Sequence, residues 1–325
     1  MNKITRDNNE KFHPVVSIII PVYNGSSFLR EAIDSALAQT YDNIEVIVVN
    51  DGSNDEGKTD RIAKSYEDKI SYFVKENGGV STALNLGIEK MRGEYFSWLS
   101  HDDKYTSDKI QKQIDAIAKI GNGNIVCLGE SQKIDVNGEI IHEKCKKRFS
   151  EGIVNWSDVL MSLLNQGTFN GCALLIPKFV FEKCGVFAEN LRFNQDSFMW
   201  MKICLQKIDF LYTKDVVAFM RIHSGQLTQR GQDIFHADCE KIRDFLQPTL
   251  LDMSTKAQNY LYAYAKYNAK YNNPNIVKSC IKDGKKRKIL SCKSIMKLRT
   301  MMLYGKIRPQ LRKVYYGLFR KVKVK

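Results

Sequence analysis

Two hydrophobic patterns alternate along the first hundred residues, and this alternation restricts the fold more than any other feature. Runs such as VSIIIPV (16–22) and IEVIVVN (44–50) are apolar on both faces, which is typical of strands covered on both sides of a sheet. The segments between such runs have apolar residues at helical spacing. This order predicts a parallel sheet with right-handed crossovers. We expect strands over 15–22, 44–50, 70–75 and 94–100, and helices over 27–39, 58–67 and 81–91.

The pattern after residue 103 is less regular. Strands and helices no longer alternate strictly, and from about residue 226 the chain reads as mainly helical and increasingly basic. The predicted fold class is therefore α/β, with a single mostly parallel sheet flanked by helices and a C-terminal helical basic extension. We expect helices over 107–120, 156–164 and 196–205, and strands over 125–130, 171–177, 208–212 and 216–223.

Polar residues follow each of the first four predicted strands. Because ligands of open parallel sheets bind at the carboxyl ends of the strands, this recurrence predicts a ligand site, although loops that are simply polar are the alternative. Two adjacent carboxylates at one of these ends repel each other unless a cation or hydrogen-bond donors compensate. The four polar ends are Pro21–Asn24, Asn50–Ser53, Asn77–Gly79 and Ser100–Asp103.

The net charge of +14 is localised at the C-terminus. Residues 275–325 contain 17 Lys and Arg and one acid, Asp283, whereas residues 1–274 contain 33 basic and 35 acidic residues. A slightly acidic body argues against a nucleic-acid partner. The basic character indicates instead that the C-terminal tail binds an anionic partner.

Cysteine usage and targeting signals indicate an intracellular protein. The eight cysteines are scattered without a C-x-x-C pair, which favours reduced structural thiols over a disulfide framework. No apolar run approaches the roughly 20 residues of a membrane helix. The polar start MNKITRDNNEKFHP lacks the apolar core of a signal peptide, so we expect a cytoplasmic location.

The segments VSIIIPVYNGSSFLREAIDSALAQTYDNIEVIVVNDGSNDEG, ENGGVSTALNLGI and GEYFSWLSHDD, in this order, resemble family 2 glycosyltransferases. These are nucleotide-sugar enzymes with the A-type fold, and the resemblance covers roughly residues 15–225. It implies an inverting transfer from a UDP-sugar with Mn²⁺ or Mg²⁺. It also divides the chain into an arm (1–14), a nucleotide-binding half (15–103), an acceptor half (104–225) and a helical basic region (226–325).

The resemblance assigns a uracil site to the ends of the first two strands. Pro21, Tyr23 and Asn24 match the segment that flanks the base, and Asp51 matches the acid that accepts a hydrogen bond from it. An aromatic face and one acceptor suit uracil, although Tyr23 could instead be a core tyrosine. In ENGGVS, Gly79 would let backbone amides approach the nucleotide.

The segment ENGGVSTALNLGI has an amide side chain at Asn85 and has Leu84 at a position where an arginine is common. Asn85 falls on a family position near the nucleotide sugar. Many members have Arg where Leu84 stands, so a phosphate contact there would have to come from elsewhere.

The sequence Ser100-His101-Asp102-Asp103 stands where the family has its metal motif, often D-S-D-D. Asp102 falls on the position that binds the metal, and Asp103 on one that binds the nucleotide sugar. Ser100 replaces the acid near the ribose. His101 is a possible ligand, but an exposed loop histidine is more often a spectator. Carboxylate and phosphate oxygens suit Mn²⁺ or Mg²⁺.

RIHSGQLTQ (221–229) resembles a later family segment. His223 would reach the diphosphate or the metal, and Arg221 would pair with phosphate. A surface loop without contact to the ligand is the alternative.

A base must take the proton of the acceptor hydroxyl, and the family places this acid in a pair at a helix start. Here the pair is Gln195-Asp196, which makes Asp196 the candidate, with a helix N-cap as the alternative. The rival acid Asp209 has no motif support. The Q-x-x-R-W signature of processive synthases is absent, which favours transfer of one sugar.

The tail contains an amphipathic pattern. A basic amphipathic helix is typical of binding to an anionic membrane surface, which would suit a peripheral enzyme with a lipid-linked saccharide acceptor at the inner face of a bacterial membrane. The alternative is an apolar face packed on the catalytic domain. Pro309 would interrupt the helix or begin it. The residues of the apolar face are Leu303, Ile307, Leu311, Val314, Leu318 and Val322.

Two other function classes are compatible with parts of the sequence. A sugar nucleotidyltransferase would need a G-x-G-x-R loop after the first strand, and PVYNGSSF lacks it. A catalytically degenerate, membrane-associated scaffold that binds nucleotide is favoured only by Ser100 in place of an acid.

Overall fold

The computed structural model describes residues 12–141, 148–226, 232–253 and 256–322, with the side chains of 308–322 outside that description. The predicted arm 1–14 therefore lies mostly outside the described residues. The chain forms two compact units, one of residues 1–159 and 169–230 and the other of residues 160–168 and 231–325.

The first half of unit 1 is the predicted parallel sheet. Its strands lie in the order β3-β2-β1-β4, and Ile19 of β1 pairs with Ile47 of β2 and Trp98 of β4. Every residue of β1 is buried, as expected of a central strand covered on both faces. The strands are β1 (Val16–Val22), β2 (Ile44–Asn50), β3 (Ser71–Val74) and β4 (Tyr95–Trp98).

The second half continues the same sheet with mixed pairing. β8 joins antiparallel to β4, and the order then runs β8-β6-β9-β5, with β6 and β9 parallel and β7 beside β9. The two strands expected over 208–223 are one strand with an irregular register opposite β6. These strands are β5 (Lys104–Tyr105), β6 (Val126–Ile134), β7 (Gly152–Val154), β8 (Leu174–Pro177) and β9 (Phe210–Arg221).

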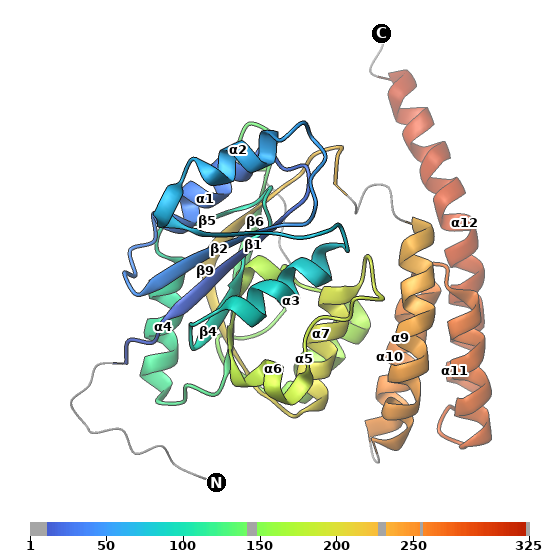
Figure 1. The fold of residues 1–325 in the computed structure, drawn as a ribbon. Coiled ribbons are helices and arrows are strands. Elements are labelled where there is room, and N and C mark those ends of the chain that lie inside the picture. The colour runs from blue at the N-terminus through green and yellow to red at the C-terminus, as the bar shows by residue number, and fades with distance from the viewer. Residues whose placement is uncertain (1–11, 142–147, 227–231, 254–255, 323–325) are drawn as a thin grey trace. The chain divides into compact units, whose positions relative to one another are not determined.

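Helices cover both faces of the parallel strands (Figure 1). Apolar residues of α1, α2 and α4 form one core with alternate residues of β1 and β2. α3 covers the other face, where Gly87 packs on Ile19 so closely that a Cβ would lie 2.4 Å from its Cγ2 atom. The helices of this unit are α1 (Leu29–Leu37), α2 (Lys58–Lys64), α3 (Val80–Lys90), α4 (Lys109–Ile120), α6 (Phe179–Cys184) and α7 (Gln195–Leu205), and α5 (Trp156–Gln166) is shared between the units.

Unit 2 is helical, as predicted for the C-terminal extension. α10 contacts α9, α11 and α12, and Gly305 of α12 lies against the backbone of Ala269. α12 continues through Pro309, so the proline neither begins nor ends the helix. Within the described residues, no helix has both the length and the apolarity to cross a bilayer. The helices are α9 (Gln232–Asp252), α10 (Ala257–Lys270), α11 (Pro274–Lys286) and α12 (Cys292–Val322).

Candidate functional site

Asp51 lies at the carboxyl end of β2 and holds the glycine loop that precedes α3. Its Oδ1 accepts from the Gly78 amide (3.0 Å) and the Lys75 ammonium (2.8 Å), and its Oδ2 accepts from the Gly79 amide (2.7 Å). The Thr82 hydroxyl lies 3.4 Å from Oδ1 but donates to the Gly79 carbonyl at 2.8 Å. Oδ1 thus accepts from two close donors and Oδ2 from one, whereas each carboxylate oxygen can accept two hydrogen bonds. These bonds fix the glycine loop and leave Oδ2 able to accept from a second donor.

The loops after β1 and β2 are joined by side-chain amides. The Asn54 amide N–H donates to Asn24 Oδ1 (2.8 Å), and Asn24 Nδ2 donates to Asn54 Oδ1 (2.7 Å). Asn24 has a positive φ of 50°, which asparagine tolerates better than most residues. Tyr23 is 42% exposed, so it is not the core tyrosine of the alternative interpretation, whereas Pro21 is buried in β1. Asn24 thus shapes the loop that presents the Tyr23 ring.

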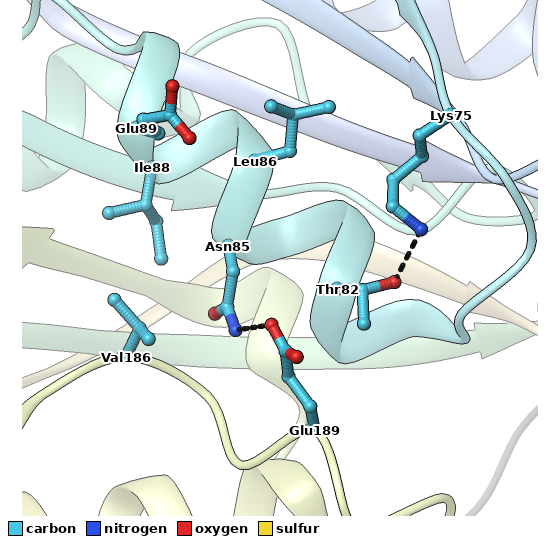
Figure 2. Close-up of a pocket in the computed structure, with 8 residues that line it drawn as sticks. All are labelled: Lys75, Thr82, Asn85, Leu86, Ile88, Glu89, Val186 and Glu189. Carbon is cyan, nitrogen blue, oxygen red and sulfur yellow. Dashed lines mark hydrogen bonds between the residues drawn. The ribbon is translucent and has the colours of Figure 1, made fainter.

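Asn85 holds a segment that precedes α7 against α3. Its Nδ2 donates to the Phe187 carbonyl (3.0 Å) and to Glu189 Oε1 (2.9 Å), and its Oδ1 accepts from the Phe187 amide (3.0 Å). Figure 2 shows the Asn85–Glu189 bond in a pocket of about 530 Å³ along α3, with Lys75 and Thr82 at its other end. The amide expected at the nucleotide sugar therefore has a positioning role here.

The two adjacent acids after β4, Asp102 and Asp103, lie in different environments. Asp102 Oδ2 lies 3.0 Å from His223 Nε2 and accepts from Gln226 Nε2 at 3.4 Å, and both Asp102 and His223 are partly buried. The predicted loop histidine thus lies beside the predicted metal carboxylate, not in a separate surface loop. Among the described residues, no cluster of three or more His, Cys, Asp or Glu side chains could surround a metal ion.

Asp103 is buried beneath Asp102. Its Oδ1 accepts from the Arg221 amide (2.9 Å), and its Oδ2 accepts from the Cys172 thiol at 3.4 Å. Burial and the neighbouring Asp102 charge raise the pKa of Asp103 to about 7. Asp103 therefore fixes the loop from below, and contact with a nucleotide sugar is not available to it in this arrangement.

Arg221 is enclosed, contrary to the role expected from its motif. Only 1% of its surface is exposed, and its ring partner is Phe28, 4.6 Å from the guanidinium carbon. Its Nε donates to the Asp102 carbonyl (2.9 Å), its Nη1 to the Asp135 and Val136 carbonyls, and its Nη2 to Glu31. A guanidinium with partners at every nitrogen and no open side does not reach phosphate. Its place in the structure is that of a positioning residue for the Asp102 loop.

His101 and Ser100 also pack inward. A Cβ on Gly25 would lie 2.6 Å from His101 Cδ2, so the ring fills the space that this glycine leaves after β1. His101 is partly buried, not exposed as expected, and burial lowers its pKa. The Ser100 amide donates to the Cys172 sulfur at 3.3 Å. Cys172 thus lies beneath the position where the family has its first acid, and burial raises the pKa of its thiol.

Asp196 stands in the first turn of α7, and the helix N-cap is Asn194. The Asp196 carboxylate accepts from the Ser197 amide and remains partly exposed. The N-cap alternative is therefore wrong for this residue. The rival Asp209 accepts from the Trp156 amide at 2.8 Å and so caps the first turn of α5.

Sequence reasoning missed several residues that build this site. Lys75 directly follows β3 at the edge where the other polar ends lie, a position that could have signalled its role. Cys172, Glu31 and Arg192 carry no such signal. Their partners lie far away in the sequence: 69 residues separate Cys172 from Asp103, and 190 separate Glu31 from Arg221.

Comparison with known proteins agrees with the fold. Two solved structures of Staphylococcus aureus TarS 1–349 have the same fold. The complex with UDP-GlcNAc has a TM-score of 0.66 at 15% identity over 91% of this chain and 92% of that chain. The complex with UDP has a TM-score of 0.60 at 18% identity over 79% and 71%.

The sequence model described as "Glycosyl transferase family 2" matches residues 17–186. A Rickettsia typhi protein named as a glycosyltransferase is 47% identical over 218 residues, which cover 67% of each chain. The chain therefore belongs to glycosyl transferase family 2. A Rickettsia bellii relative is 43% identical over 270 residues, 82% of this chain but 38% of that protein, so this chain spans less than half of that relative's length.

Proposed function

We propose that this chain is an inverting glycosyltransferase that moves one hexosyl or N-acetylhexosaminyl group from a UDP-sugar to a saccharide acceptor. The observation that carries the proposal is the Asp102–His223 pair at the carboxyl edge of the sheet. The choice of UDP is supported by the TarS complexes with UDP and UDP-GlcNAc, which have the same fold. At this edge Tyr23 offers an exposed ring face to a base.

Asp102 and His223 would hold Mn²⁺ or Mg²⁺. Asp102 Oδ2 and His223 Nε2 lie 3.0 Å apart, so both would be within reach of one ion once the imidazole nitrogen is deprotonated. Two protein ligands suffice because diphosphate and water supply the others. Such an ion acts as a Lewis acid that neutralises the leaving diphosphate.

Asp196 would be the base. It lies in the first turn of α7 and keeps part of its carboxylate exposed, so an acceptor hydroxyl can approach it. Accepting the hydroxyl proton as the oxygen attacks the anomeric carbon gives a single displacement with inversion.

The C-terminal region would bring the enzyme to its acceptor. Leu303 and Ile307 of α12 are 63% and 48% exposed, and Lys306, which lies between them in the sequence, is exposed as well. Exposed apolar and basic residues on one helix suit an anionic membrane surface. We therefore propose peripheral association with the cytoplasmic face of a bacterial membrane and a lipid-linked saccharide acceptor, as in surface polysaccharide or glycoconjugate synthesis.

Thermal unfolding with UDP, GDP, dTDP and CMP, each with and without Mn²⁺, tests the donor and the metal. A ligand present at a hundred times its dissociation constant stabilises the native state by about 2.7 kcal/mol. We expect Mn²⁺-dependent stabilisation by UDP that Asp102→Asn loses. A well-folded wild type that responds to no nucleotide would contradict transfer. Nucleotide binding without sugar turnover would favour the degenerate scaffold, to which Ser100 points.

A further inference from the structure

Among the residues that the structure describes, little accessible positive charge lies at the strand-end edge. The Lys75 ammonium is 2.8 Å from an oxygen of Asp51, which neutralises it. The Arg221 guanidinium is enclosed by its own partners. A UDP-sugar would bring two phosphate charges to an edge that also carries Asp102. A cation that reaches the surface would compensate the diphosphate charge at this edge.

The glycine loop cannot supply this charge through its backbone. The Gly78 and Gly79 amides both donate to the Asp51 carboxylate. Backbone N–H groups before a helix are a common anion site, but here a carboxylate of the chain itself occupies them. A cationic side chain next to this loop is therefore better placed than these two amides to compensate phosphate.

Arg192 places a guanidinium on this loop. It lies in the segment between α6 and α7 and is exposed. A Cβ built on Gly79 would lie 2.5 Å from Arg192 Nη1 and 3.4 Å from its Cζ. The guanidinium thus rests on the face of Gly79 that has no side chain. Gly79 also has a φ of +93°, a conformation that glycine adopts without strain.

The segment that carries Arg192 is fixed at both ends. Asn85 holds its start through both backbone groups of Phe187, and α7 begins three residues after Arg192. Arg192 therefore lies in a constrained connection between the glycine loop and the helix of Asp196. A guanidinium held in this way needs little further ordering to bind an oxyanion with two parallel N–H donors.

We propose that Arg192 binds the diphosphate of the nucleotide-sugar donor while its guanidinium packs against Gly79. This inference rests on the proposed function, because it takes the donor to be a nucleoside diphosphate sugar. Arg192 contacts phosphate and not the base, so its contribution depends on the phosphates of the ligand.

The test compares the binding of UDP, UMP and uridine, each with Mn²⁺, to the full chain by calorimetry. Arg192→Gln should weaken UDP binding roughly tenfold or more, since hydrogen bonds to charged groups are worth that much, and leave uridine binding unchanged. Arg192→Lys should recover part of the loss. The matched control is Arg92→Gln, which removes an exposed guanidinium that pairs with Glu45 at the start of β2.

Gly79→Ala is a second, independent variant. Its methyl group would occupy the place of Nη1, so UDP binding should again weaken more than uridine binding. Equal losses for UDP and uridine in Arg192→Gln, or no loss for UDP, would overturn the proposal. If the wild type binds UDP no better than uridine, the proposed donor itself is wrong and the inference falls with it.

Discussion

The Nε2 atom of His223 lies 3.0 Å from Oδ2 of Asp102, although 121 residues separate them in the sequence. The contact joins the loop after β4 to the loop after β9, which end in different halves of the sheet. Both loops are fixed by Arg221, which donates from its backbone to Asp103 and from its side chain to the Asp102 carbonyl. The pair is therefore held before any ligand binds.

Removing either member of the pair should weaken metal binding. We expect His223→Ala and Asp102→Asn each to lower the apparent Mn²⁺ affinity, measured by electron paramagnetic resonance in the presence of UDP, by roughly tenfold or more. His13→Ala is the control, because His13 pairs with the exposed Asp42 before β2. Wild-type Mn²⁺ affinity in both variants would contradict the assignment.

Arg221 should contribute to stability much more than a surface arginine. Arg221→Met leaves the Asp102, Asp135 and Val136 carbonyls without their donor, and we expect a loss of about 2–4 kcal/mol in the free energy of unfolding by urea. Arg92→Met, which breaks a pair whose arginine is 81% exposed, should cost less than about 1 kcal/mol. Similar losses in the two variants would refute this difference.

The contact between α3 and β1 should not tolerate a methyl group. Gly87→Ala would place a Cβ 2.4 Å from Ile19 Cγ2, and overpacking of this kind costs about 1–3 kcal/mol. Ile19→Ala makes room at the same place. A double-mutant cycle by urea unfolding should therefore give a combined loss smaller than the sum of the two single losses. Additive losses would show that the two residues do not oppose each other.

Lys109 should give the protein a distinctive pH dependence. Its ammonium is fully buried and donates to Ser97, Gln113 and the Leu174 carbonyl, and burial lowers the pKa of Lys109 from 10.5 to about 7. Between these two pKa values the unfolded chain binds a proton that the folded chain lacks, so this residue's contribution to stability rises with pH.

Lys109→Met removes this contribution, so the free energy of unfolding of the wild type should rise relative to that of the variant between pH 7 and pH 9. Lys119→Met, at an exposed position in the last turn of α4, should show no such change. A constant difference between wild type and Lys109→Met across this range would contradict the pKa shift.

The exposed residues of α12 should carry membrane binding. Leu303→Ser with Ile307→Ser should reduce sedimentation with vesicles that contain anionic lipid several-fold, because the apolar contribution is lost. Val74→Ser, at a 60% exposed position in β3, is the control. UDP binding should be unchanged in all variants. Vesicle binding that survives the double change would contradict this role for Leu303 and Ile307.

The parallel half of the sheet could be predicted because its strands are apolar on both faces. VSIIIPV has no polar side that would fit an amphipathic helix, and its burial is continuous in β1. β5 and β7 could not be predicted, since strands of two and three residues carry no periodicity. α6, with six residues, has the same difficulty.

The location of the site at one edge of the sheet could be predicted from the sequence, but the contacts between its side chains could not. Strand order brings Asp51 and Asp102 to that edge, as the sequence pattern predicts, whereas His223 was indicated only by the family resemblance. The enclosure of Arg221 depends on Glu31 and on a turn at Asp135, 86 residues away, and no local pattern reports such packing. Asn85 likewise finds Phe187 across 102 residues.

The hydrogen bonds between Asn85 and Phe187 limit how independently the sequences before and after residue 103 can change. Both hydrogen-bonding groups of the Phe187 backbone depend on one amide side chain that belongs to the other half. A chimera that exchanged residues 104–225 between relatives would also have to include the residues of α3 that contact this segment, such as Asn85. The natural boundary for exchanging this part of the chain therefore lies before α3, not after Asp103.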